Sequence, residues 1–134
     1  MPNSAQLQKL KAAAKIASAR AYAPYSKFHV GAAVLTGSGK IFTGGNVENA
    51  SYGLSNCAER TAIFTAVAAG EKQLRCVVVY TPTKTVTAPC GACRQVINEF
   101  GPTARVISFC AGRGEIDVSL DALLPGAFGP ADLK

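Results

Sequence analysis

The chain of 134 residues is 49% hydrophobic and 16% charged, which excludes an intrinsically disordered protein and predicts one globular domain over residues 1–134. No apolar run approaches the ~18 residues that span a bilayer, so we expect no membrane partner. The chain has a net charge of +6, and the whole excess of basic residues lies before Glu48. That region holds six Lys or Arg residues and no acidic ones. We interpret this charge as a solvated helix face in preference to a nucleic-acid-binding face or a mitochondrial leader.

The first half of the chain predicts one amphipathic helix followed by a β-hairpin. Apolar residues spaced by three or four indicate a helix from Asn3 to about Tyr22, with Gln6 completing a capping pair. Phe28–Leu35 then has the composition of a strand, and Lys40–Thr43 follows a glycine-containing turn as its hairpin partner. His29, the single histidine, would alternate with its neighbours on the first strand, and we assign it no role.

The second half alternates helices with apolar strands. The link Ala111–Arg113 is too short for a parallel crossover, so the last two strands should form an antiparallel pair. These elements predict an α/β fold with a mixed five-stranded sheet covered by helices. The expected elements are a polar loop Gly44–Gly53, suited to recognition or to plain connection, a helix Cys57–Ala69, a strand Arg75–Tyr80, a loop Thr81–Ala88, a helix Cys90–Phe100, strands Arg105–Cys110 and Gly114–Val118, and a short helix Leu120–Leu124.

Three cysteines from two separate segments predict a metal site. Cys90 and Cys93 are three residues apart at a helix start, and Cys57 opens another helix, where the positive end of the dipole favours thiolates. Structural zinc sites have four protein ligands, whereas catalytic ones keep a position open, so the trio favours a catalytic Zn²⁺ site. Cys76 and Cys110 could supply a fourth ligand, but their positions in apolar strands suit packing.

Cysteine usage also bears on the compartment. Five cysteines is an odd number, and the segment Ala17–Ala19 resembles a signal-peptide cleavage site only in its small residues. Lys11 and Lys15 interrupt the apolar run that should precede such a site. We therefore expect a reduced, cytoplasmic setting, in which clustered cysteines are more often metal ligands or catalytic residues than disulfides.

Glu59 and Arg60 directly follow the first cysteine. Glu59 could cap its own helix together with Asn56. Alternatively, Cys57 and Glu59 diverge by about 200° on a helix, so they can meet only beyond its end, where a metal would lie. A carboxylate there could take a proton from a metal-activated water and pass it on. Arg60 could moderate the negative charge of three thiolates, or it could be an ordinary surface arginine.

At this point the motifs match a family. The residues at 57–59, followed by those at 89–93, resemble the zinc deaminase signature in its three-cysteine form. The similarity covers nearly the whole chain, and it is to the small, homotetrameric cytidine deaminases. The further stretches that carry it are Tyr25–Ala33, Gly45–Tyr52, Asn56–Ala62 and Leu123–Phe128.

The resemblance implies a three-layer α-β-α sandwich and hydrolysis of cytidine and 2′-deoxycytidine to uridine and 2′-deoxyuridine with release of ammonia, as in pyrimidine salvage. It implies one Zn²⁺ per subunit on Cys57, Cys90 and Cys93. Glu59 would shuttle protons to N3 and to the departing amino group, while Arg60 would soften the thiolate charge. The residues implied to bind the nucleoside are Phe28, Asn46, Glu48, Tyr52, Ala58 and Phe128, the last lent to a neighbouring subunit's pocket.

Four other functions fit parts of the pattern. A nucleic-acid deaminase would share the ligands, but an acidic Glu48 would repel a 3′-phosphate, and the last strand pair leaves no room for the helix such enzymes typically have. The Asn46–Tyr52 loop is more similar to cytidine deaminases than to a blasticidin-type deaminase. A structural zinc module requires four protein ligands, and a Cys-x-x-Cys redox protein leaves Cys57 and Glu59 without a role.

Overall fold

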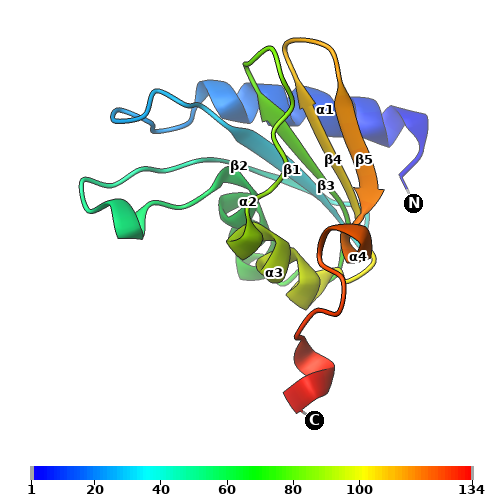
Figure 1. The fold of residues 1–134 in the computed structure, drawn as a ribbon. Coiled ribbons are helices and arrows are strands. Elements are labelled where there is room, and N and C mark those ends of the chain that lie inside the picture. Colours follow the sequence, from blue (N-terminus) through cyan, green and yellow to red (C-terminus); the bar gives the residue numbers. More distant parts are fainter. Residues whose placement is uncertain (1, 134) are drawn as a thin grey trace.

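Helices cover both faces of one five-stranded sheet in the computed structural model of the protein, which describes residues 2–133 (Figure 1). The strand order is β2-β1-β3-β4-β5. The elements are α1 (Ser4–Ala19), β1 (Gly31–Thr36), β2 (Ile41–Gly45), a 3-10 turn (Tyr52–Leu54), α2 (Ala58–Ala68), β3 (Leu74–Thr81), α3 (Gly91–Phe100), β4 (Arg105–Cys110), β5 (Glu115–Ser119), α4 (Leu120–Leu123) and a second 3-10 turn (Pro130–Leu133).

The sheet is mixed, which confirms the predicted α/β fold. Strand β1 runs antiparallel to both β2 and β3, whereas β3 and β4 are parallel. The parallel pair is joined through α3, and β4 and β5 form the antiparallel pair expected from their short connection. Because β3 leads into the start of α3, the carboxyl end of β3 faces the segment where two of the cysteines lie.

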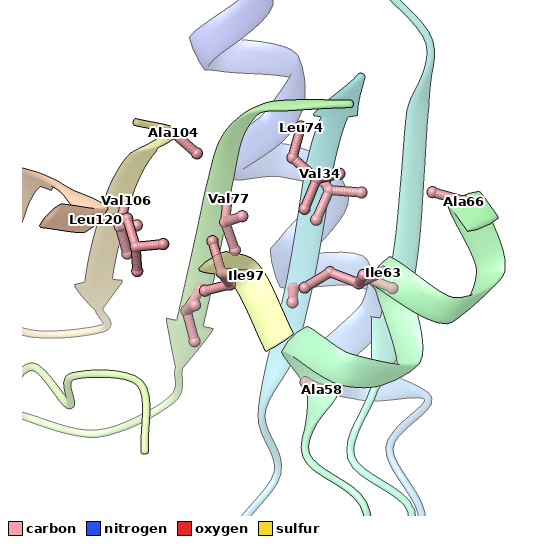
Figure 2. Close-up of a cluster of buried hydrophobic side chains, with 13 residues drawn as sticks. Val34, Ala58, Ile63, Ala66, Leu74, Val77, Ile97, Ala104, Val106 and Leu120 are labelled. Atoms are coloured by element: carbon pink, nitrogen blue, oxygen red, sulfur yellow. The ribbon is translucent and has the colours of Figure 1, made fainter. Parts of the chain in front are cut away.

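Two hydrophobic cores hold the three layers together. The larger core lies between the sheet and the helices α2, α3 and α4, and Figure 2 shows Ile63 and Ile97 meeting Val34 and Val77 of the sheet. The smaller core lies under α1, where Leu10 and Ala14 pack on strand residues. The sheet is thus buried on both faces, which explains the almost continuous apolar character of β1 and β3.

Two glycines allow the helices to approach the sheet closely. A Cβ atom at Gly31 would lie 1.9 Å from the carbonyl oxygen of Ala14, so α1 could not pack on β1 there. A Cβ atom at Gly44 would lie 2.6 Å from the backbone nitrogen of Ala62 in α2. The first turn of α2, with Cys57 just before it, is therefore held directly against strand β2.

Strand β1 begins at Gly31 rather than at Phe28, so the predicted start was wrong. The side chain of Asn46 takes the backbone groups that a strand partner would otherwise take. Its Oδ1 accepts from the Val30 N–H at 2.8 Å, and its Nδ2 donates to the Phe28 carbonyl at 2.8 Å. His29 still alternates with its neighbours as predicted, because Phe28 and Val30 line one cavity whereas His29 lines a separate hollow beside α1.

The basic helix α1 ends at Ala19, three residues before the predicted end, and the capping box of Asn3 and Gln6 is confirmed. Two of its lysines contact strand residues, one on the edge strand β5 and one on the central strand β3. Lys11 pairs with Glu115, and the Lys15 Nζ lies 5.5 Å from the ring centroid of Tyr80. Part of the positive charge of the N-terminal region therefore makes contacts within the chain. Within residues 2–133, no helix combines the length and apolar character that crossing a membrane requires.

Candidate metal centre and adjoining cavity

The three predicted ligands lie at two adjacent helix starts. Cys57 is the residue before the first turn of α2, and Cys90 holds the same position before α3. The Cys90 sulfur also accepts from the backbone N–H of Cys93 at 3.4 Å. A pair of backbone bonds between Val47 and Asn56 fixes the entry to α2. The helix dipoles therefore place their positive ends beside the sulfurs and stabilise thiolates.

The spacing of the sulfurs fits one tetrahedral ion. Bonds of about 2.3 Å to Zn²⁺ place tetrahedral sulfurs about 3.8 Å apart. Cys57 Sγ lies 3.7 Å from Cys90 Sγ, which lies 3.3 Å from Cys93 Sγ, and all three lie within 4.8 Å of one another. Among residues 2–133 no other Cys, His or acidic side chain joins this group. The donor set therefore fits Zn²⁺ with three protein ligands.

The remaining cysteines lie outside this group. Cys76 is fully buried in β3, and burial raises the pKa of its thiol to about 11. The Cys110 sulfur lies near three backbone carbonyls, the closest being that of Arg113 at 3.6 Å. Both cysteines act as packing residues, so neither supplies a fourth ligand.

Arg60 contacts the metal-ligand sulfurs directly. Its Nη2 donates to the Cys57 sulfur at 3.3 Å, so it is not a solvated surface arginine. Interaction with the Cys93 thiol, followed by the Arg60 and Cys90 hydrogen bonds, lowers the pKa of Cys57 to about 5. The Cys57 thiolate is thus available without a metal, and the guanidinium offsets part of the charge that three thiolates bring together.

Glu59 is a buried carboxylate next to these sulfurs. Its side chain is 4% exposed, yet it lines the cavity in front of the ligands. Burial raises the pKa of its carboxyl group above the ordinary value, and the Cys57 charge adds to this effect. Cys57, not Asn56, is the N-cap residue of α2, so Asn56 and Glu59 do not form a capping pair, and the Glu59 carboxylate interacts with its own backbone N–H. A carboxyl group with a raised pKa is suited to both holding and releasing a proton.

The ligands and Glu59 open on a cavity of about 270 Å³. This volume lies near the lower end of ordinary small-ligand sites. The predicted residues that line it, besides the cysteines at 57 and 90, are Phe28, Asn46, Glu48, Ala58 and Glu59. Figure 1 shows the loops that carry Phe28 and Glu48 projecting from the same end of the fold.

Two predicted nucleoside contacts lie outside this cavity in the single chain. Tyr52 is 76% exposed and lines an adjoining hollow on the far side of Glu48, where its ring lies 6.0 Å from that of Tyr25. Phe128 is 59% exposed, and its backbone carbonyl accepts from Gln95 and Asn98 on α3. Neither residue therefore lines the cavity of its own chain.

Other residues that line the cavity were not predicted from the sequence. Thr87 and Ala88 belong to the loop before Cys90. Their position just before a predicted metal ligand was the one sequence feature that could have placed them at the cavity. Strand β3 contributes residues that local periodicity marks only as core. The lining residues not foreseen are Val30, Ser55, Asn56, Val79, Thr81, Thr87 and Ala88.

Comparison with known proteins agrees with this site. Residues 4–110 match a family model described as the cytidine and deoxycytidylate deaminase zinc-binding region. The cytidine deaminase of Sporosarcina psychrophila is 46% identical over 129 residues, which cover 96% of this chain and 95% of that protein. A probable cytidine deaminase of Dictyostelium discoideum is 47% identical over 132 residues, covering 98% and 89% of the two chains.

Crystal structures show the same fold at comparable identity. The cytidine deaminase of Burkholderia pseudomallei superposes with a TM-score of 0.86 at 52% identity, covering 90% of this chain and 98% of that one. The enzyme of Mycobacterium tuberculosis gives a TM-score of 0.79 at 39% identity, covering 92% and 97% of the two chains.

Proposed function

The chain belongs to the cytidine deaminase family of zinc-dependent hydrolases, and on that premise we propose that it deaminates free cytidine and 2′-deoxycytidine in this cavity. The observation that carries the proposal is a buried carboxylate, Glu59, beside three clustered thiols at the floor of a small cavity. The products are uridine or 2′-deoxyuridine and ammonia.

The chemistry divides between the ion and the protein. When bound by Cys57, Cys90 and Cys93, Zn²⁺ supplies a Lewis acid that makes water nucleophilic toward C4 of the base. Glu59 takes up the proton that this water loses and delivers it to N3 of the cytosine ring. Glu59 then takes the second proton of that water from the hydroxyl group now bonded to C4 and delivers it to the exocyclic nitrogen. The C4–N bond breaks, the C4 carbonyl forms, and ammonia leaves. Burial of Glu59 keeps its proton from exchanging with bulk solvent.

The walls of the cavity position the nucleoside. Phe28 offers an aromatic face to the pyrimidine, and the backbone at Ala58 offers polar groups to its edge. Asn46 and Glu48 lie at the mouth, where an amide and an acceptor carboxylate suit sugar hydroxyl groups. Arg60 remains on the Cys57 sulfur and keeps the ligand set from becoming too electron-rich to polarise water.

The charge at the mouth favours free nucleosides over nucleic acid. Hydrogen bonds from Ser26 and from backbone N–H groups lower the pKa of Glu48, so its carboxylate is ionised in neutral solution. An anion there repels the phosphate that would follow the sugar in a polynucleotide. The connection between β4 and β5 also contains no helix that could carry a nucleic-acid groove.

The proposal includes a homotetramer in the cytoplasm. Large apolar side chains remain exposed around the cavity mouth, including Tyr25, Tyr52 and Leu54, and they would be buried by neighbouring subunits. The five cysteines are all free thiols, as a reducing compartment would keep them. Light scattering tests the assembly, and a mass equal to the single chain of 13.8 kDa in active protein would contradict it.

Substrate turnover tests the proposed function. The purified protein should deplete the absorbance bands of cytidine and 2′-deoxycytidine, and should leave cytosines in a single-stranded oligonucleotide intact. Removal of zinc by a chelator should abolish turnover, and added Zn²⁺ should restore it. Deamination of the oligonucleotide with none of the nucleosides would refute the proposal in favour of a nucleic-acid enzyme.

A further inference from the structure

The segment from Tyr25 to Val30 carries Phe28 to the cavity without belonging to a helix or a strand. Side chains from the loop after β2 hold it in place. Asn46 binds the backbone at both Phe28 and Val30, as described above. The other end of the segment is held by Glu48, one of the residues proposed to bind the sugar.

Hydrogen bonds from this segment occupy most of the acceptor positions of the Glu48 carboxylate. Its Oε1 accepts from the backbone N–H groups of Tyr25 and Ser26, at 3.0 and 3.1 Å. Its Oε2 accepts from the hydroxyl group of Ser26. A carboxylate offers about four acceptor positions, so these three bonds leave about one for a sugar hydroxyl. The direction of that remaining position is therefore set by the groups that fix the carboxylate.

The hydroxyl group of Ser26 links the carboxylate to Phe28. Its hydrogen is used on Glu48, so its oxygen is free to accept, and it accepts from the Phe28 N–H at 3.0 Å. Lys27, between them, has a φ of 63°, a conformation that a non-glycine residue rarely adopts without support. The bond from the Phe28 N–H to the Ser26 hydroxyl oxygen spans Lys27 and contributes to that support.

We propose that Ser26 is a positioning residue, which couples the orientation of Glu48 toward a sugar hydroxyl to the placement of Phe28 against the base. This inference rests on the proposed nucleoside deamination. Loss of the hydroxyl group removes the bond that fixes Oε2 of Glu48 and releases the Phe28 backbone, so sugar recognition weakens first. Ser26 forms no hydrogen bond with the three thiols or with Glu59. Its loss should therefore leave the residues that break the C4–N bond in place.

The chain contains a matched control at the opposite end of β1. Ser38 also donates its hydroxyl group to a carboxylate, that of Glu71, which in turn accepts from Thr36. Ser38 lies in the β1–β2 turn and Glu71 in the connection between α2 and β3, and neither lines the cavity. Ser38→Ala therefore removes the same kind of bond without touching the proposed sugar site.

Steady-state kinetics of Ser26→Ala, Ser26→Thr and Ser38→Ala test the coupling, with cytidine and 2′,3′-dideoxycytidine as substrates. For Ser26→Ala we expect kcat/KM for cytidine to fall about ten-fold, mainly through KM, as for loss of a hydrogen bond to a charged group. The dideoxy substrate, which lacks the 2′- and 3′-hydroxyl groups, should lose no more than about three-fold. Ser26→Thr should recover most of the loss because it restores the hydroxyl group, and Ser38→Ala should match the unmodified protein.

Two results would overturn the inference alone. Equal losses for the two substrates in Ser26→Ala would show a general structural defect rather than sugar positioning. Kinetics of Ser26→Ala indistinguishable from those of Ser38→Ala would show that the hydroxyl group positions nothing. Absence of cytidine turnover in the unmodified protein is a different outcome, because it overturns the proposed function and this inference with it.

Discussion

Replacing Arg60 by glutamine should weaken zinc binding while leaving all three thiols in place. The guanidinium Nη2 lies 3.3 Å from the Cys57 sulfur. At that separation two unit charges attract by ~5 kcal/mol at an effective dielectric constant of about 20, and by ~1.3 kcal/mol in water. The contact is partly exposed, so we take about 1.5–3 kcal/mol, the usual range for a hydrogen bond to a charged group.

This free energy corresponds to zinc affinity about 10–100-fold lower in Arg60→Gln, in line with other residues that contact metal ligands. Competition against a chromogenic chelator of known affinity measures the difference. Arg105→Gln is the control, because Arg105 binds Asp117 through two bonds and contacts none of the three ligand sulfurs. If the two variants bind zinc within a factor of two of each other, the charge-balancing role of Arg60 is refuted.

Two further predictions concern the metal-free thiols and the packing of α1. Because the pKa of Cys57 is lowered to about 5, its alkylation by iodoacetamide in metal-free protein should stay nearly constant from pH 8 to pH 6 and fall only below that range, as followed by site-resolved mass spectrometry. A ten-fold rise per pH unit between 6 and 8 would indicate an ordinary thiol. Gly31→Ala should lower the free energy of unfolding in urea by about 1–3 kcal/mol or more, because the new Cβ atom would overlap α1. Gly53→Ala, whose Cβ atom would meet nothing within 4 Å, is its control, and equal unfolding free energies would contradict the prediction.

The metal centre was predictable because its chemistry depends on few residues at short spacing. Cys90 and Cys93 occupy a helix start, and Cys57 occupies another, so both groups could be placed by local signals alone. The parallel pairing of β3 and β4, which aligns the strands that flank α3, follows from the helix between them. The short link before β5 similarly determined the last antiparallel pair.

The details that sequence reasoning missed depend on contacts between distant segments. Strand β1 begins late because Asn46, sixteen residues after Val30, takes the backbone bonds of that stretch. No local pattern shows that exchange, since an apolar run predicts a strand whether or not a side chain competes for its backbone. The role of Ser26 was hidden for the same reason, because its partner Glu48 lies twenty-two residues away.

Turnover by Glu59→Gln tests the central claim most directly, since glutamine keeps the size of the side chain and cannot shuttle a proton. The account predicts a full complement of zinc and a kcat for cytidine lower by about 10²–10⁴-fold, whereas Glu71→Gln, which alters a carboxylate bonded in the β1–β2 turn, keeps normal activity. A zinc-loaded Glu59→Gln variant with kcat within ten-fold of the unmodified protein would contradict the claim that this buried carboxylate moves the protons.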